Sequence, residues 1–152
     1  QPHENPMAES VPMLGLGQIT AALLDAGARL DAIHSFEINP AFCDHLRREH
    51  PRLRVYRDRA ENFGRHGIED VKAVVSGLPL LSMDLGTQRR IVGGAFEHLR
   101  PGGSFIQFTY GLAPPVKKII RDELALGWAR SETIWGNVPP ATSYAFYRRR
   151  AA

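Results

Sequence analysis

The sequence predicts one α/β domain over residues 1–152, with a mostly parallel β-sheet covered by helices. Apolar runs of strand length alternate with helical patterns from residue 11 to residue 126, and two further strand-like runs close the chain. The length of 152 residues suits one domain, and 43% apolar with 23% charged residues suits a packed core.

The first predicted unit is a short buried strand, Val11–Leu14, that ends in the loop Gly15-Leu16-Gly17. A helix follows and stops at Gly27, because glycine commonly ends helices. The apolar face of this helix holds Ile19, Leu23 and Leu24.

The second predicted strand is Ala32–Phe36, and Asn39-Pro40 after it is typical of a helix cap followed by the first helical residue. We expect that helix to bury Phe42 and Leu46. A third strand is predicted over Leu53–Tyr56.

Val71–Val75 is continuous enough in valine and alanine to predict a fourth strand that is buried on both faces. The next helix, Thr87–Leu99, is expected to stop sharply at Arg100-Pro101-Gly102-Gly103 before a fifth strand at Phe105–Thr109. Its apolar stripe holds Ile91, Val92, Ala95, Phe96 and Leu99.

The last helix is marked by four apolar residues, Val116, Ile119, Ile120 and Leu124. Ala129–Trp135 and Ser143–Arg148 then predict a closing antiparallel strand pair.

Composition excludes several classes of protein. No apolar run is long enough to span a bilayer, and none resembles a secretory signal. One cysteine, Cys43, excludes an internal disulfide and favours a reducing compartment, and the six histidines lack metal-ligand spacing, so no metal is expected. The formal charge of +3 suits an anionic partner without identifying it.

Two features point to a cofactor. Gly15-Leu16-Gly17 lies between a strand and a helix, where a ligand can approach the backbone, and Glu37 lies twenty residues beyond Gly17. A carboxylate at that place can accept hydrogen bonds from both hydroxyls of an adenosine ribose. The alternative is a plain tight turn and an exposed glutamate.

Two further segments follow strands at the same predicted edge of the sheet. Ser76-Gly77-Leu78-Pro79 ends the fourth strand, where the ligands of open α/β sheets bind, and it could equally be a simple turn. Tyr110 ends the fifth strand and either faces that crevice or joins the core.

Together these segments resemble the soluble-type bacterial phospholipid N-methyltransferases. The resemblance covers about Val11 to Arg148 and rests on the glycine loop and five later motifs. These are Glu37-Ile38-Asn39-Pro40, Val75–Ser82, Leu99–Gly103, Gln107–Gly111 and Trp135–Ala141. It implies a Rossmann-like class I methyltransferase fold with a seven-stranded sheet. It also implies S-adenosylmethionine as methyl donor and stepwise methylation of phosphatidylethanolamine to phosphatidylcholine.

The resemblance also implies roles for individual residues. The implied cofactor contacts are Gly15 and Gly17 at the methionine part, Glu37 and Ile38 at the ribose, Asp58, Arg59 and Ala60 at the adenine, and Ser76, Gly77, Leu78 and Pro79 at the methyl group. The catalytic candidates are Tyr110, Ser76 and Gly77, and the substrate-binding candidates are Tyr110, Trp135, Asn137 and Lys117.

The resemblance implies a cytoplasmic protein that associates peripherally with the anionic inner face of the membrane. Two departures bear on this expectation. The glycine loop is about two residues shorter than in the family, and Gln1–Ser10 is too short to be the basic amphipathic helix that precedes the first strand there. We therefore expect the chain to lack that helix.

Three other functions remain open. A methyltransferase acting on a nucleic-acid base shares the fold and the basic charge, although such enzymes usually place an aromatic residue after the proline, where this chain has Leu80. A nicotinamide-dependent dehydrogenase fits less well, because Thr20 replaces the third glycine of its motif. A cofactor-binding or membrane-binding module without turnover is the third.

Overall fold

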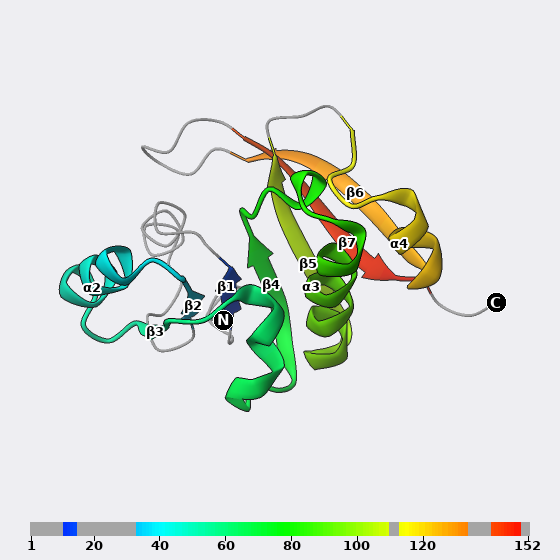
Figure 1. The fold of residues 1–152 in the computed structure, drawn as a ribbon. Coiled ribbons are helices and arrows are strands. Elements are labelled where there is room, and N and C mark those ends of the chain that lie inside the picture. Colours follow the sequence, from blue (N-terminus) through cyan, green and yellow to red (C-terminus); the bar gives the residue numbers. More distant parts are fainter. Residues whose placement is uncertain (1–10, 15–32, 110–112, 134–140, 150–152) are drawn as a thin grey trace, which may run out of the picture.

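The computed structural model describes residues 11–14, 33–109, 113–133 and 141–149. In these residues seven strands form one sheet in the order β3-β2-β1-β4-β5-β7-β6 (Figure 1). The strands are β1 (Val11–Leu14), β2 (Ile33–Phe36), β3 (Arg54–Tyr56), β4 (Val71–Ser76), β5 (Leu99–Thr109), β6 (Leu126–Thr133) and β7 (Ala141–Arg148). The helices are α2 (Pro40–Glu49), α3 (Leu85–His98) and α4 (Lys118–Glu123), with short 3-10 helices η3 (Ala60–His66) and η4 (Leu80–Ser82).

The pairing of the strands confirms the predicted mixed sheet. β1 lies between β2 and β4 and is parallel to both, and β3 and β5 extend the parallel part on either side. β7 is antiparallel to β5 and to β6, as predicted for the closing pair. The predicted helix with Ile19, Leu23 and Leu24 lies outside the described residues.

The main core lies between the sheet and helices α3 and α4. The stripe Ile91, Val92, Ala95 and Phe96 of α3 packs on large residues of the sheet. These sheet residues include Phe36, Val74, Phe105, Tyr144 and Phe146. Each such side chain, fully buried, contributes roughly 1.5 to 3 kcal/mol, so this layer is the main source of stability for the domain.

Helix α2 packs beside β3, at one end of the sheet, and its buried residues lie outside that core. Side chains alternate along a strand, so Val75 faces away from the core that holds Val74. Cys43 and Leu46 of α2 are also buried outside that core. The prediction for Leu46 is thus confirmed, whereas Phe42 is only half-buried, because the helix turns Cys43 toward the sheet and Phe42 toward its rim.

The sharp stop predicted at Arg100–Gly103 is wrong in part. Helix α3 does end at His98, but Leu99 already begins β5 and pairs with Val71. The next pair is Ala73 with Ser104, so the intervening residues of β5 form a bulge in which Gly102 has φ +81°. A side chain at Gly103 would meet two backbone oxygens at 2.9 Å.

The last helix is shorter than its apolar pattern predicts. Val116 and Ile120 are buried, but Ile119 is 49% exposed. The helix ends at Glu123, and Ala125 has φ +53°, which turns the chain at once into β6. β6 therefore begins at Leu126, earlier than the predicted Ala129, which lengthens the antiparallel pair.

One buried polar side chain connects three elements. Gln88 of α3 is fully buried, and its Nε2 donates to the carbonyl of Leu80 in η4 at 2.7 Å. Its Oε1 accepts from the backbone N–H of Lys117, at the start of α4, at 2.7 Å. The carbonyl of Leu80 also accepts from the backbone N–H of Met83 at 3.0 Å, so Gln88 adds a second hydrogen bond to η4 and one to the start of α4.

We predict that Gln88→Leu lowers the free energy of unfolding by about 1 to 3 kcal/mol, because the backbone N–H of Lys117 loses its partner and the carbonyl of Leu80 keeps only the hydrogen bond from Met83. Urea unfolding followed by far-UV circular dichroism measures this loss. Glu97→Leu, on the exposed side of the same helix, is the control and should change it by less than about 0.5 kcal/mol. Equal midpoints for Gln88→Leu and the wild type would contradict the bridging role.

Candidate functional site

A cavity of about 570 Å³ opens where β2, β3 and β4 end. Because these strands are parallel, the residues that follow them meet at one edge of the sheet, beside the start of α3. The wall is formed by Phe36, Glu37, Ile38, Asp58, Arg59, Ala60, Glu61, Leu78, Met83, Thr87 and Ile91.

Six of the residues predicted to contact a cofactor lie on this wall. They are Glu37, Ile38, Asp58, Arg59, Ala60 and Leu78. They come from three loops that are far apart in the sequence, so their convergence is a result of the fold. Most of the remaining wall is apolar, and Glu37, Asp58 and Glu61 supply its acidic groups.

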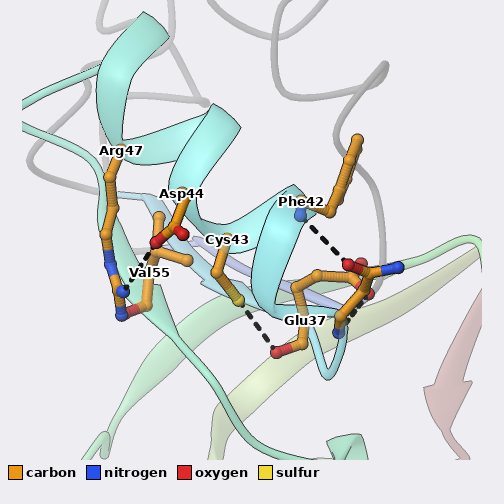
Figure 2. A network of polar contacts seen from close by, with 7 residues as sticks. Glu37, Phe42, Cys43, Asp44, Arg47 and Val55 are labelled. Atoms are coloured by element: carbon orange, nitrogen blue, oxygen red, sulfur yellow. Dashed lines mark hydrogen bonds and ion pairs between the residues drawn. The ribbon is translucent and has the colours of Figure 1, made fainter.

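Glu37 is held by hydrogen bonds to its backbone and to its carboxylate (Figure 2). Its backbone N–H donates to the carbonyl of Tyr56 at 3.0 Å, and its own carbonyl accepts from the Cys43 thiol at 3.2 Å. Its carboxylate accepts from the backbone N–H of Asn39 at 3.1 Å. The side chain of Asn39 in turn caps α2 by accepting from the N–H of Phe42 at 3.2 Å, as predicted from the sequence.

The carboxylate of Asp58 has three donors. Oδ1 accepts from the backbone N–H of Arg59 at 2.7 Å and from Asn62 Nδ2 at 2.8 Å. Oδ2 is 2.8 Å from Nε2 of His66. The hydrogen bonds from Asn62 and His66, with that from Arg59, lower the pKa of Asp58 from 3.8 to about 2. An ionised acid therefore stands on the cavity wall across the neutral pH range.

The turn after β4 is supported from inside. Ser76 is fully buried, and its Oγ accepts from the N–H of Leu78 at 3.2 Å. The carbonyl of Leu78 accepts from Nε2 of Gln107 in β5 at 2.7 Å. Only Leu78 of the predicted Ser76-Gly77-Leu78-Pro79 segment reaches the cavity wall, while Pro79 is exposed and leads into η4.

The remaining predicted site residues divide into two groups. Gly15, Gly17, Tyr110, Trp135 and Asn137 fall outside the described residues. Lys117 precedes α4, where its backbone N–H donates to Gln88, and it does not line the cavity.

Sequence reasoning missed the far wall of the cavity, formed by Met83, Thr87 and Ile91. Helix α3 begins two residues before the predicted Thr87, because Asp84 caps it by accepting from the N–H of Thr87 at 2.8 Å. Asp84 three residues before Thr87 is a recognisable cap signal. It would have placed the first turn of α3 next to the loop after β4.

Two features are absent from the described residues. No group of three or more His, Cys, Asp or Glu side chains in these ranges could hold a metal ion. No helix within them is long and apolar enough to cross a membrane.

We predict that the Asp58 contacts make the protein more stable above about pH 4 than below it. The folded pKa of about 2 lies under the ordinary 3.8, so the stabilisation is present above 3.8 and is lost as the pH falls toward 2. Asp58→Asn should therefore lose less stability than the wild type between pH 6 and 2. Urea midpoints at four pH values measure the difference, and parallel curves would contradict it.

The sequence matches no protein-family model and none of the curated proteins compared with it. The structure, by contrast, is similar to several solved methyltransferases. An rRNA methylase from Streptococcus thermophilus superposes with a TM-score of 0.62 at 14% identity, over 97% of this chain and 94% of that one.

Two other solved structures share the architecture. The glycopeptide N-methyltransferase MtfA, in complex with S-adenosyl-L-methionine, gives a TM-score of 0.69 at 14% identity, over 93% of this chain and 87% of that one. An O-methyltransferase from Thermotoga maritima gives 0.63 at 13% identity, over 95% of this chain and 61% of that one. The expected fold is thereby confirmed: the chain has the Rossmann-like fold of the class I methyltransferases.

Proposed function

We propose that the chain is an S-adenosylmethionine-dependent methyltransferase that methylates the amine of a phospholipid. One observation carries the cofactor part of this proposal. In a class I methyltransferase fold, the acid after β2, the acid after β3 and the turn after β4 border a single cavity. This is the edge where open α/β sheets bind their ligands.

The chemistry of the cavity fits an adenosine group. A volume of about 570 Å³ is typical of small-molecule sites. Phe36, Ile38 and Met83 offer apolar surface to a flat base, and Glu37 and Asp58 offer acceptors to hydroxyl and amine groups. We assign the ribose to Glu37 and Ile38 and the adenine to Asp58, Arg59 and Ala60.

S-adenosylmethionine, when bound, supplies a methyl group on a positively charged sulfur. The chain then has to bind the acceptor and align it, and alignment alone can contribute effective molarities on the order of 10⁵ M or more. We assign Ser76, Gly77, Leu78 and Pro79 to the neighbourhood of the transferred methyl. The hydrogen bonds of the turn to Ser76 Oγ and Gln107 keep its backbone in one position.

An amine acceptor has to be neutral to react, although a primary amine like that of lysine has a pKa of roughly 10.4 in water. A dry pocket favours the neutral form. We assign the orientation of the amine to Tyr110, with Trp135 holding the methylated cation through its ring and Asn137 beside it. Lys117 is assigned to the lipid phosphate.

The phospholipid substrate rests on the sequence motifs around Glu37, Ser76, Gln107 and Trp135, which resemble those of phospholipid N-methyltransferases. The formal charge of +3 supports a peripheral contact with an anionic, cytoplasmic membrane face. Phosphatidylethanolamine is the substrate that this resemblance implies, and phosphatidylcholine the final product.

A second candidate is methylation of a nucleic-acid base. It is favoured by the similarity to solved rRNA methylases, whose fold this chain shares. One contact weighs against it. The residue after Pro79, where an aromatic ring would stack on a base, is Leu80, which is 1% exposed and packs in the core.

The test gives the protein S-adenosylmethionine together with vesicles of phosphatidylethanolamine and phosphatidylglycerol, and separately with bacterial rRNA. Mass spectrometry of the lipids should show mono-, di- and trimethylated phosphatidylethanolamine. If the rRNA bases were methylated and the lipid were unchanged, the substrate would be a nucleic acid and not a phospholipid. No methylation of either would refute both.

We predict that Glu37→Gln weakens the binding of S-adenosylhomocysteine by about 10- to 100-fold, since hydrogen bonds to a charged group contribute roughly 1.5 to 3 kcal/mol. Isothermal titration calorimetry measures the affinity. Glu49→Gln, on the exposed end of α2, is the matched control and should bind like the wild type. Unchanged affinity in Glu37→Gln would remove Glu37 from the site.

A further inference from the structure

Asp58 is one of the acidic residues on the cavity wall, and its two oxygens are used differently. Oδ1 already accepts two hydrogen bonds, from the backbone of Arg59 and from Asn62. Oδ2 accepts one, from His66. A carboxylate oxygen has two acceptor positions, so Oδ2 keeps one for another donor.

The contact with His66 determines which nitrogen of the ring carries hydrogen. The ionised carboxylate can only accept, and its low pKa keeps it ionised at neutral pH, so Nε2 of His66 has to be the donor. The ring itself packs against two aromatic residues, Phe36 and Tyr56, which are stacked on each other with ring centroids 4.8 Å apart. It lies edge-on to Phe36, with ring centroids 5.3 Å apart, and tilted against Tyr56 at 4.7 Å.

These contacts give Oδ2 one fixed position. Phe36 belongs to the main core and also lines the cavity, so the ring of His66 is anchored to a rigid part of the wall. Rotation of the carboxylate about its last bond would break the hydrogen bonds on Oδ1 and also the one from His66 on Oδ2. His66 is thus the donor that fixes the direction of the remaining acceptor position of Oδ2.

We propose that His66 is a positioning residue that holds Asp58 so that Oδ2 accepts the exocyclic amine of the bound purine. The site then selects a 6-amino purine over a 6-oxo purine. This rests on the proposed function. A 6-oxo purine has a carbonyl oxygen in place of the amine, which neither donates to Oδ2 nor tolerates a carboxylate beside it.

The test separates the two parts of the His66 side chain. His66→Phe keeps an aromatic ring against Phe36 and Tyr56 but has no donor. His66→Gln loses the ring but keeps an N–H at about the place of Nε2. Each variant, and the wild type, is titrated calorimetrically with S-adenosylhomocysteine and with S-inosylhomocysteine, its 6-oxo counterpart.

His98→Phe is the matched control. His98 makes the same kind of contact, with Nδ1 2.8 Å from the carboxylate of Glu69 and its ring edge-on to Phe63 at 5.1 Å, but it does not line the cavity. Asn62→Ala is a second positioning variant, because it removes one donor from Oδ1. Urea midpoints verify that each protein titrated is folded.

We expect the wild type to prefer the 6-amino ligand by about 10-fold or more, as one hydrogen bond to a charged group would allow. His66→Gln should keep that preference. His66→Phe should lose the preference, because it binds the 6-amino ligand more weakly and the 6-oxo ligand as before. Asn62→Ala should reduce the preference, and His98→Phe should match the wild type.

Three results would overturn the positioning role. The first is an unchanged preference for the 6-amino ligand in both His66→Phe and Asn62→Ala. The second is a loss of preference in His66→Gln as large as in His66→Phe, and the third is an equal loss of affinity for both ligands in His66→Phe. Wild-type protein that binds neither ligand would instead refute the proposed function, and this inference with it. The binding of the unsubstituted protein therefore distinguishes the two failures.

Discussion

The parallel alignment of β2, β3 and β4 is the constraint on which the site depends. Parallel strands end at the same edge, so the residues after each strand converge there however far apart they lie in the chain. Glu37, Asp58 and Leu78 meet on one cavity wall for this reason. The packing of α3 on β5 and of α2 on β3 supports the strands.

Side chains that bond to backbone groups hold the convergent loops still. Gln107 supports the turn after β4, Gln88 ties η4 to α3 and α4, and the Cys43 thiol and the carbonyl of Tyr56 hold the chain at Glu37. Each replaces a hydrogen bond that a loose loop would make with water. The wall is therefore organised before any ligand arrives, which lowers the entropic cost of binding.

The strands and most of the wall could be predicted from the sequence, because apolar runs mark strands and polar loops after them mark the ligand edge. Other features depend on contacts between distant residues. The residues around Gly102 have the sequence of a helix stop, but pairing with β4 makes them a bulge within β5. Gln88 is polar and buried, so the apolar pattern of α3 does not predict it. The far wall at Met83 was missed because the helix begins at its cap rather than at its apolar stripe. The substrate does not follow from the strand pattern or from the fold, because one fold hosts many reactions.

Because of its position, Cys43 can be used to measure how often helix α2 separates from the sheet. The thiol is fully buried, and burial raises its pKa, so in the native state it is neither accessible nor ionised. It is also the only cysteine of the chain. Its modification by a thiol reagent therefore requires α2 to separate from the sheet. Because the same thiol donates to the carbonyl of Glu37, the modification rate would report the opening of one rim of the cavity without an introduced cysteine.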